Sequence, residues 1–276
     1  MNPVQKALAR ATEQLRDHSD TARLDSELLM AAAFNLSRDR LLLDPPSGSV
    51  PPEFEAMVKR RAEGEPVAYI TGHRAFWTID LEVGPGVLIP RPDSETLLVA
   101  ALEHFDGGPE PKRVLDLGTG PGTLLLAALD QWPKSSGLGI DSSEAALEFA
   151  RRNASRLGME RRAKFAIGNW TDDVEGAFDL ILCNPPYVAR NAELGPGVRE
   201  FEPHEALFAG DDGLDDLRKL AQSIPHHIGK GGMAAIEIGH DQGDSAPALF
   251  ANQGVDVRLA HDLAERPRAV ILERPA

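Results

Sequence analysis

Residues 113–130 read RVLDLGTGPGTLLLAALD, so an apolar run of strand length passes through a glycine-rich turn into a helical pattern. The same alternation of short apolar runs and helical patterns continues toward the C-terminus. It predicts an α/β fold with a doubly wound, mostly parallel, Rossmann-like sheet. No helical pattern separates the last two apolar runs, so we expect these two to pair antiparallel. The expected strands are RVLDL (113–117), SGLGI (136–140), AKFAI (163–167), FDLILC (178–183), MAAIEI (233–238), VDVRLA (255–260) and RAVILE (268–273).

The N-terminal quarter of the chain shows only helical patterns. In residues 1–75, apolar side chains recur at helical spacing over 4–15 and again around Leu24, Leu28 and Leu29. Paired prolines then interrupt the pattern, and a third helix is expected after them, in EFEAMVKRRAEG. We therefore expect a small helical bundle whose second helix carries an apolar stripe of Leu24, Leu28, Leu29 and Ala32.

The chain divides into three predicted parts. The segment FWTIDLEV (76–83) alternates apolar and polar residues and ends at a Gly-Pro-Gly sequence, which indicates a strand followed by a turn. We expect a helical bundle over 1–75, a strand-and-turn linker over 76–92 and the α/β domain over 93–276.

The charge of the protein is acidic and unevenly distributed. The formal net charge is −14, of which residues 1–75 carry −1 and residues 76–276 carry −13. Because non-specific binding to nucleic acid depends on lysine and arginine side chains that neutralise phosphates, this balance disfavours a general DNA-coating role. We expect no direct nucleic-acid partner.

Several other classes are excluded by composition. The 276 residues contain no apolar run of about 18 residues, so no membrane span is expected. The single cysteine, Cys183, excludes an internal disulfide and a multi-cysteine zinc site, and the eight histidines show no metal-ligand spacing. We expect a cytoplasmic protein without a metal.

The glycine turn after the first expected strand is a candidate cofactor site. Glycines at such a turn let the backbone approach a ligand where a side chain would clash. The spacing is G-x-G-x-G, not the G-x-G-x-x-G of dinucleotide folds, and an aspartate precedes it. This arrangement suits the amino-acid tail of S-adenosyl-L-methionine; an ordinary tight turn is the alternative. The candidate cofactor residues here are Asp116, Gly118, Thr119, Gly120, Pro121 and Gly122.

Two later strand ends add candidate cofactor ligands. Asp141 ends the second expected strand, where a carboxylate can accept hydrogen bonds from both ribose hydroxyls; alternatively it caps the following helix. Asn169 and Trp170 follow the third strand, where an amide and an indole could read and cover an adenine ring. The alternative for Trp170 is a partly buried core aromatic.

The motif NPPY (184–187) follows the fourth expected strand. Consecutive prolines hold the backbone extended and leave no amide hydrogens to donate, so the side-chain oxygen of Asn184 and the carbonyl of Pro185 remain as acceptors. Two adjacent acceptors suit a planar NH2 group, over which Tyr187 can lie. The alternative is a loop that is stiffened by its prolines and binds nothing. It is disfavoured because ligands of parallel sheets bind at the carboxyl ends of the strands. The predicted substrate-binding residues are Asn184, Pro185, Pro186 and Tyr187, and those predicted to act in catalysis are Asn184, Pro185 and Tyr187.

Such a pocket suits methyl transfer to an amide nitrogen. This nitrogen is a poor nucleophile because its lone pair is delocalised into the carbonyl group. Holding both hydrogens of the NH2 group can direct the lone pair toward a sulfonium methyl for in-line displacement. Catalysis would then rest on positioning and electrostatics, not on a charged general base or a metal.

These motifs together resemble the protein-(glutamine-N5) methyltransferases of peptide chain release factors, the HemK/PrmC family. The resemblance covers nearly the whole chain, whereas NPPY alone is shared with amino methyltransferases of adenine and cytosine. The segments that carry it are GEPVAYITGHRAFW (64–77), GVLIPRPDSE (86–95), VLDLGTGPG (114–122), NPPY (184–187), EPHEALFAGDDGL (202–214) and EIGHDQ (237–242).

The resemblance implies a class I methyltransferase fold and transfer of a methyl group from S-adenosyl-L-methionine to the glutamine side chain in the GGQ motif of release factors. S-adenosyl-L-homocysteine would be the product. It also implies that residues 118–122, Asp141, Trp170 and Asn184 contact or border the cofactor, that 184–187 hold the glutamine amide, and that the helical region helps dock the release factor. We expect a monomer without a membrane partner.

The chain departs from the family pattern at three places. Relatives usually have RPET where this chain has RPDS (91–94), which is a conservative change of the acid. Pro121 stands within the glycine turn where Ser or Thr is usual, and the first position of a helix tolerates it. Asn169 replaces a common aspartate, so its carbonyl oxygen would accept any hydrogen bond from adenine N6.

Three other functions fit parts of the pattern. A DNA adenine-N6 methyltransferase could use the same acceptors, but it must extract a base and hold phosphates, which the acidic charge disfavours. A glutamine methyltransferase of a ribosomal protein shares most of the motifs. A noncatalytic module with a bound cofactor would leave the NPPY pocket without a use.

Overall fold

The computed structural model describes residues 2–275 and contains two compact units. The first unit holds the residues up to His73 together with Leu194–Phe201, a segment far along the chain that contains the short helix α9 (Val198–Phe201). The second unit holds Arg74–Glu193 and the residues from Glu202 onward. None of the helices within residues 2–275 is long and apolar enough to cross a membrane.

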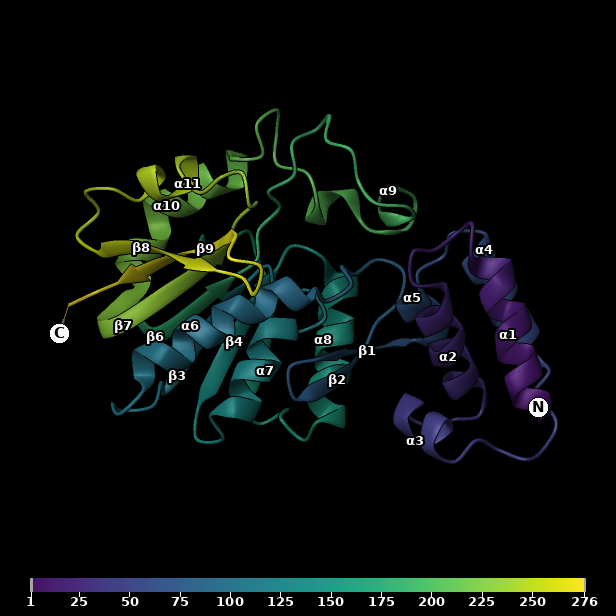
Figure 1. The fold of residues 1–276 in the computed structure, drawn as a ribbon. Coiled ribbons are helices and arrows are strands. Elements are labelled where there is room, and N and C mark those ends of the chain that lie inside the picture. The colour runs from purple at the N-terminus through teal and green to yellow at the C-terminus, as the bar shows by residue number, and fades with distance from the viewer. Residues whose placement is uncertain (1, 276) are drawn as a thin grey trace. The chain divides into compact units, whose positions relative to one another are not determined.

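The first unit is a bundle of short helices (Figure 1). Helix α1 begins with a capping box: the Asn2 side chain accepts a hydrogen bond from Gln5 N (3.0 Å), and the Gln5 side chain accepts one from Asn2 N (3.2 Å). Fully buried Phe54, Leu29 and Met30 belong to its apolar core. The helices of the bundle are α1 (Pro3–Leu15), α2 (Ala22–Ala33), α3 (Arg38–Leu43), α4 (Glu53–Ala62) and α5 (Val67–Thr71).

The predicted apolar stripe of α2 is only partly buried. Leu29 is fully buried, but the Leu24 side chain is 39% exposed and Leu28 is half-buried. The helix instead buries Asp25, which accepts hydrogen bonds from Arg61 Nε (2.7 Å) and two hydroxyl groups. An acidic residue can occupy the inner face because these donors compensate its lost hydration.

The predicted single strand over 76–83 is a hairpin instead. Strand β1 (His73–Phe76) pairs with β2 (Ile79–Glu82), and Trp77 makes the turn with a φ of 54°. A left-handed backbone at a bulky residue is unfavourable unless neighbouring contacts fix it. One such contact is the hydrogen bond from Trp77 N to Glu95 Oε1 (3.0 Å).

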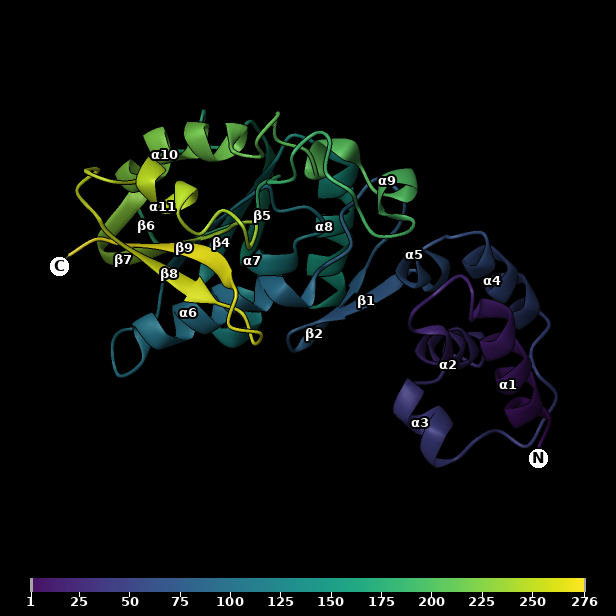
Figure 2. The same ribbon diagram turned by 45° about the horizontal axis from the view of Figure 1, so that its top comes forward.

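The second unit is built on a seven-stranded sheet, which confirms the predicted doubly wound, mostly parallel fold (Figures 1 and 2). The strand order is β5-β4-β3-β6-β7-β9-β8, and only the pairings of β9 with β7 and β8 are antiparallel. The predicted antiparallel pairing of the last two strands is also confirmed. The strands are β3 (Arg113–Leu117), β4 (Ser136–Asp141), β5 (Ala163–Ile167), β6 (Phe178–Cys183), β7 (Ile228–Glu237), β8 (Asp256–His261) and β9 (Pro267–Glu273).

Helices cover both faces of this sheet. Helices α6, α7 and α8 lie on one face and α10 and α11 on the other, as Figure 2 shows. Helix α6 follows a 3-10 turn at Pro92–Ser94, and another such turn lies at His204–Ala206. The helices of this unit are α6 (Glu95–Phe105), α7 (Thr123–Gln131), α8 (Glu144–Arg156), α10 (Asp215–His227) and α11 (Ser245–Leu249).

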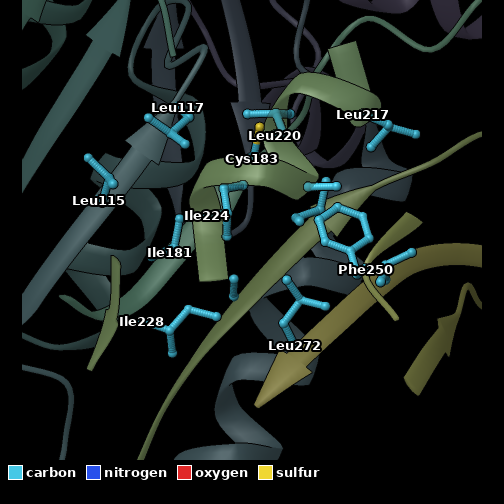
Figure 3. Packing of buried hydrophobic residues seen from close by; sticks show 14 of the residues in the cluster. Leu115, Leu117, Ile181, Cys183, Leu217, Leu220, Ile224, Ile228, Phe250 and Leu272 are labelled. Carbon is cyan, nitrogen blue, oxygen red and sulfur yellow. The ribbon is translucent and has the colours of Figure 1, made fainter. Parts of the chain in front are cut away.

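A large cluster of buried apolar side chains lies between the sheet and α10 (Figure 3). Leu217, Leu220 and Ile224 on α10 pack in one cluster with Leu115 of β3 and Ile181 of β6. Burial of such side chains contributes roughly 1.5–3 kcal/mol each. The apolar runs of the central strands are continuous because both faces of the sheet are covered.

The parallel register sets the carboxyl ends of three strands level. Leu117 at the end of β3 is paired with Ile140 of β4 and with Cys183 of β6. The residues that follow these three positions, Gly118, Asp141 and Asn184, therefore meet at one edge of the sheet.

A buried amide connects the hairpin, the glycine turn and helix α8. Asn153 Oδ1 accepts a hydrogen bond from Glu82 N (2.7 Å), and its Nδ2 donates to Glu82 O (3.0 Å) and Pro121 O (3.0 Å). Asn153 is fully buried, so these three hydrogen bonds take the place of the water molecules that its amide group loses on folding. The glycine turn is thus held from outside the sheet.

We expect the substitution Asn153→Ala to lower the free energy of unfolding by about 1–3 kcal/mol, because it leaves buried backbone groups without partners. Urea denaturation measures the change, and amide hydrogen exchange at Glu82 should accelerate. Asn191→Ala, at an exposed position, is the control and should leave both unchanged. An unaltered denaturation midpoint in Asn153→Ala would show that the amide does not secure this region.

Candidate active site

A cavity of about 410 Å³ opens at the carboxyl edge of the sheet in the second unit. Its walls come from the ends of β3, β4, β5 and β6, from the loop before α6, and from the segment around the second 3-10 turn. The predicted site residues that line it are Gly118, Gly120, Asp141, Asn169, Trp170, Asn184 and Pro186.

The glycine turn forms the floor of this cavity because its backbone folds back toward β4. Gly118 N and Thr119 N both donate to Ile140 O, at 2.9 and 3.0 Å. Gly118 has a φ of 70°, and a Cβ atom there would lie 3.3 Å from the Trp170 ring. Gly120 has a φ of 55°, a left-handed conformation that other residues rarely adopt. The positive φ angles therefore favour glycine at both positions, and a Cβ atom at Gly118 would also lie in tight contact with the Trp170 ring.

Asp141 lines the cavity and does not cap α8. Its Oδ2 accepts a hydrogen bond from Gly120 N (2.8 Å), and its Oδ1 accepts one from Ser143 N (2.9 Å). The N-cap of α8 is Ser143, whose hydroxyl accepts from Ala146 N. Burial raises the pKa of Asp141, although three backbone N–H groups oppose this. Each carboxylate oxygen has a second lone pair, so the group can still accept ligand hydroxyls.

Asn169 and Trp170 also lie on the cavity wall. The Asn169 Nδ2 donates to Asp172 Oδ2 (3.0 Å), which turns the carbonyl oxygen of the amide away from Asp172. Trp170 Nε1 donates to Asp216 Oδ1 (3.3 Å), and its ring packs against the apolar core. Both of the interpretations of Trp170 are compatible with this position, since its ring contacts the core and also borders the cavity.

Asp116 carries an unusual carboxyl group. The side chain is buried, and its Oδ2 accepts hydrogen bonds from Thr119 Oγ1 (2.6 Å) and Leu125 N (3.0 Å). Its Oδ1 is buried and has no hydrogen-bond partner within residues 2–275. Burial raises the pKa of Asp116 to about 7. A buried oxygen without a donor is costly, which indicates that a ligand with a hydrogen-bond donor or a positive charge completes the site.

A second, smaller cavity of about 40 Å³ adjoins Asp116. Gly118, Gly120 and Asn184 line both cavities, so the two spaces share the glycine turn. The predicted site residues that line only the smaller one are Asp116, Thr119 and Pro121. Those that line neither are Gly122, Pro185 and Tyr187.

The NPPY segment has its polar groups fixed by residues beneath it. Asn184 Nδ2 donates to Ser94 Oγ (3.1 Å), and the Tyr187 hydroxyl donates to Glu237 Oε1 (3.0 Å). Gln242 Nε2 donates to the carbonyl of Tyr187 (3.1 Å). Burial raises the pKa of Tyr187, and the carboxyl group of Glu237 raises it further. The side-chain orientations of both Asn184 and Tyr187 are therefore set by hydrogen bonds.

Sequence reasoning missed three residues that hold the site. Ser94 and Glu237 contact the NPPY segment, and Glu202 Oε2 accepts from Ile89 N (3.0 Å) while its Oε1 accepts from Arg91 (2.5 Å). Glu202 thereby fixes the loop 86–91, whose first residues line the larger cavity. The sequence does contain one signal for Glu237. A glutamate within the apolar run MAAIEI is expected to be buried, and a buried carboxyl group needs a polar partner.

Cys183 precedes Asn184 in the chain and is fully buried. Burial holds the pKa of its thiol well above the usual range. The thiol does not line either cavity.

The sheet order, the glycine turn after β3 and the carboxylate at the end of β4 define an S-adenosylmethionine-dependent methyltransferase. Two solved structures share this fold. A methyltransferase from Pyrococcus furiosus has a TM-score of 0.53 and 17% sequence identity, and it covers 80% of this chain and 98% of its own. The T. thermophilus 16S rRNA N2 G1207 methyltransferase, in complex with AdoMet and guanosine, has a TM-score of 0.52 and 18% identity; the match covers 73% of this chain and 49% of that one.

The sequence matches two family models: the PrmC N-terminal domain over residues 6–72 and the methyltransferase small domain over residues 92–201. Relatives named release factor glutamine methyltransferase include the following three. The one from Rhodospirillum rubrum is 42% identical over 92% of this chain and 79% of its own. The one from Xylella fastidiosa (strain Temecula1) is 41% identical over 96% and 95%, and the one from Caulobacter vibrioides is 38% identical over 98% of each chain. This chain belongs to the release factor glutamine methyltransferase family.

The residues present fit the cofactor of this class. The unpartnered Asp116 Oδ1 suits a cationic amino group, the glycine turn leaves space for a ligand backbone, and Asp141 retains acceptor capacity.

We expect Asp116→Asn to weaken the binding of S-adenosyl-L-homocysteine roughly tenfold or more, since a charge-assisted hydrogen bond contributes about 1.5–3 kcal/mol. Both bonds that Asp116 now accepts fall on one oxygen, so asparagine can keep them while it presents NH2 at the other position. Isothermal titration calorimetry measures the affinity. In wild type the affinity should fall as pH drops below about 7, where Asp116 takes up a proton, and this dependence should vanish in Asp116→Asn.

Asp173→Asn, at an exposed position, is the matched control and should bind like wild type at every pH. Equal affinities of wild type and Asp116→Asn would show that the Asp116 carboxylate does not contact the ligand.

Proposed function

We propose that this protein transfers a methyl group from S-adenosyl-L-methionine to the side-chain amide nitrogen of the glutamine in the GGQ motif of peptide chain release factors. The observation that carries the proposal is the hydrogen bond from Asn184 Nδ2 to Ser94 Oγ. It commits the NH2 group of Asn184 to the protein interior, so the amide presents its oxygen as an acceptor. The family relation of the chain supports the same reaction.

The cofactor would be held by the residues around the glycine turn. Asp116 would take the amino group of the methionine tail, Asp141 the ribose hydroxyls, and Asn169 with Trp170 the adenine ring. Gly118, Thr119, Gly120, Pro121 and Gly122 would form the surrounding turn, and Asn184 would border the sulfonium end. When bound, the cofactor supplies an electrophilic methyl group and leaves as S-adenosyl-L-homocysteine.

The substrate amide would be oriented by acceptors and by an aromatic ring. The oxygen of Asn184 and the carbonyl of Pro185 would each accept one hydrogen of the glutamine NH2 group, which turns the nitrogen lone pair toward the methyl group. Pro186 keeps the backbone extended. The Tyr187 ring, fixed through its hydroxyl by Glu237, would cover the planar amide. Catalysis by positioning requires no charged base.

The helical unit would contribute the surface that docks the release factor. Leu42 and Leu43 on α3 are exposed, and the Leu43 side chain is 85% accessible. Exposed apolar side chains of this size suit a protein partner. We propose that the enzyme acts as a monomer in the cytoplasm, where release factors work at the ribosome.

We expect Asn184→Ala to lower kcat/KM about a hundredfold or more, because a preorganised group at the reacting atom is lost. The affinity for S-adenosyl-L-homocysteine should change only a fewfold. Transfer of labelled methyl to purified release factor measures the first quantity and calorimetry the second. Asn191→Ala serves as the control. Parallel losses of both quantities would identify Asn184 as a cofactor ligand only.

The acceptor is tested with wild-type enzyme on three substrates: release factor, release factor with its GGQ glutamine replaced, and duplex DNA. We expect label on the first alone. Label on DNA would favour an adenine-N6 methyltransferase. No label on any of them would direct the search to ribosomal proteins and contradict the proposal.

We expect Leu43→Asp to raise the KM for release factor several-fold without changing the affinity for S-adenosyl-L-homocysteine, because charge at an apolar contact is costly. Steady-state methylation at varied release factor concentration measures this. Asp39→Ala, at another exposed position on α3, is the control. An unchanged KM in Leu43→Asp would remove Leu43 from the docking surface.

A further inference from the structure

The loop between β7 and α11 contains a glutamine whose side chain is buried among backbone groups. The Nε2 atom of Gln242 donates to Tyr187 O (3.1 Å) and to Gly213 O (3.1 Å). Its Oε1 atom accepts a hydrogen bond from Gly239 N (2.9 Å). Both hydrogens of the amide are thus in use. This one side chain therefore joins its own loop to two segments that are distant in the sequence.

The first of these distant segments is the NPPY motif. The C=O group of Tyr187 and the N–H group of Val188 belong to the same peptide group. Val188 N donates to Leu207 O (2.9 Å), while Tyr187 O accepts the hydrogen bond from Gln242. The plane of this peptide is therefore held from both sides. The peptide groups before the two prolines of the motif have no N–H and cannot be held in this way.

The second segment presses on the same carbonyl group. Gly213 has a φ of 74°, and a Cβ atom there would lie 2.2 Å from Tyr187 O and 2.9 Å from Gln242 Nε2. Both distances are shorter than van der Waals contact allows, so the Gly213 backbone packs directly against these two groups. The place of the Tyr187 carbonyl is thus fixed by a hydrogen bond and by close packing.

These contacts determine where the aromatic ring of Tyr187 lies. The Tyr187 hydroxyl donates to Glu237 Oε1 (3.0 Å), so β7 holds the far end of the side chain. Gln242 holds the near end, because a fixed peptide plane limits the backbone rotation that would swing the Cα–Cβ bond. The side chain of Tyr187 is only half-buried. A ring that is held at both ends can cover a planar group without being ordered at the moment of binding.

The main chain of Gln242 does not explain its side chain. Gln242 N donates to Gly239 O (2.9 Å) and Gln242 O accepts from Ala246 N (2.9 Å), which shapes the turn before α11. A residue of almost any type can make these two bonds. The side-chain contacts, in contrast, need an NH2 donor and a carbonyl acceptor together. A glutamate of the same shape would place an oxygen against two carbonyl oxygens.

We propose that Gln242 is a positioning residue for methyl transfer, which holds the Tyr187 ring over the substrate amide through the Tyr187 carbonyl. The proposal rests on the function proposed above for the NPPY motif and deepens it. It adds that the loop after β7 determines the place of the ring, although none of residues 238–244 lines either cavity.

The test is a double-mutant cycle in kcat with Gln242→Glu, Tyr187→Ala and the double variant on purified release factor. Gln242→Glu keeps the shape and the acceptor for Gly239 N but replaces the donor by an oxygen. We expect it to lower kcat roughly tenfold to a hundredfold, as misplacement of a group at the reacting centre does. In the Tyr187→Ala background it should lower kcat less than about twofold further, because the ring through which it acts is already absent.

The KM for release factor and the affinity for S-adenosyl-L-homocysteine should stay within a fewfold of wild type in Gln242→Glu. Gln222→Glu, at an exposed position on α10, is the matched control for the new charge and should keep the wild-type kcat.

A second pair of variants tests the same carbonyl group without a charge, and it decides the question if Gln242→Glu does not fold. Gly213→Ala places a methyl group against Tyr187 O and should lower kcat by a similar factor. Gly254→Ala is its matched control, since Gly254 has the same φ of 74° but no atom within 4 Å of an added Cβ. This control carries the same backbone strain and should keep the wild-type kcat.

Any of four results would overturn the proposal: an unchanged kcat in Gln242→Glu, a kcat in Gly213→Ala equal to that in Gly254→Ala, losses that multiply in the double variant, or a loss of cofactor affinity that matches the loss of kcat. If wild-type enzyme labels release factor and Tyr187→Ala is impaired, such a result concerns Gln242 alone. If wild-type enzyme transfers no methyl group to release factor, or Tyr187→Ala keeps the wild-type kcat, the proposed function or its use of the ring fails, and the role of Gln242 fails with it.

Discussion

Strand β3 is hydrogen-bonded to parallel neighbours on both sides, and this pairing fixes the relative positions of the three strand ends at that edge of the sheet. It sets Gly118, Asp141 and Asn184 level with one another although they come from distant parts of the sequence. Because the central strands β3, β6 and β7 are buried under helices, the side chains at this edge lie next to an apolar core. The polar groups at this edge that are buried need hydrogen-bond partners within the protein, whereas those that line the cavity stay accessible to a ligand.

The polar residues that satisfy this requirement come from segments outside the sheet edge. Asn153 on α8 holds the glycine turn, Glu202 holds the loop 86–91, and Ser94 with Glu237 holds the NPPY segment. Asp116 differs from them because one of its oxygens has no partner within residues 2–275. The protein thus supplies fixed orientations for the predicted substrate ligands, and it leaves acceptor capacity at the position predicted for the cofactor.

The strands and the glycine turn could be predicted because their signals are local: an apolar run of strand length, a turn residue and a helical pattern. The extended backbone of the NPPY segment could also be predicted, because proline restricts its own φ angle whatever surrounds it. The inner face of α2 could not be predicted, because the burial of Asp25 depends on a hydrogen bond from Arg61, which lies on another helix. Ser94 and Glu237 were missed for the same reason: sequence separation hides that folding brings both to Asn184 and Tyr187. The hairpin at Trp77 depends on a contact with Glu95 that no local pattern reveals.

The burial of Cys183 and Tyr187 has a consequence for chemical selectivity. A thiolate or a phenolate is a far stronger nucleophile than an amide, so either ion beside a sulfonium methyl group would compete with the intended acceptor. Both side chains flank the NPP segment, and the surroundings raise the pKa of each. A thiol and a phenol are mostly protonated at neutral pH, and these shifts reduce the ionised fraction of each group further. The enclosure that orients the pocket therefore also disfavours the two ionised groups that could compete with an amide for a methyl group.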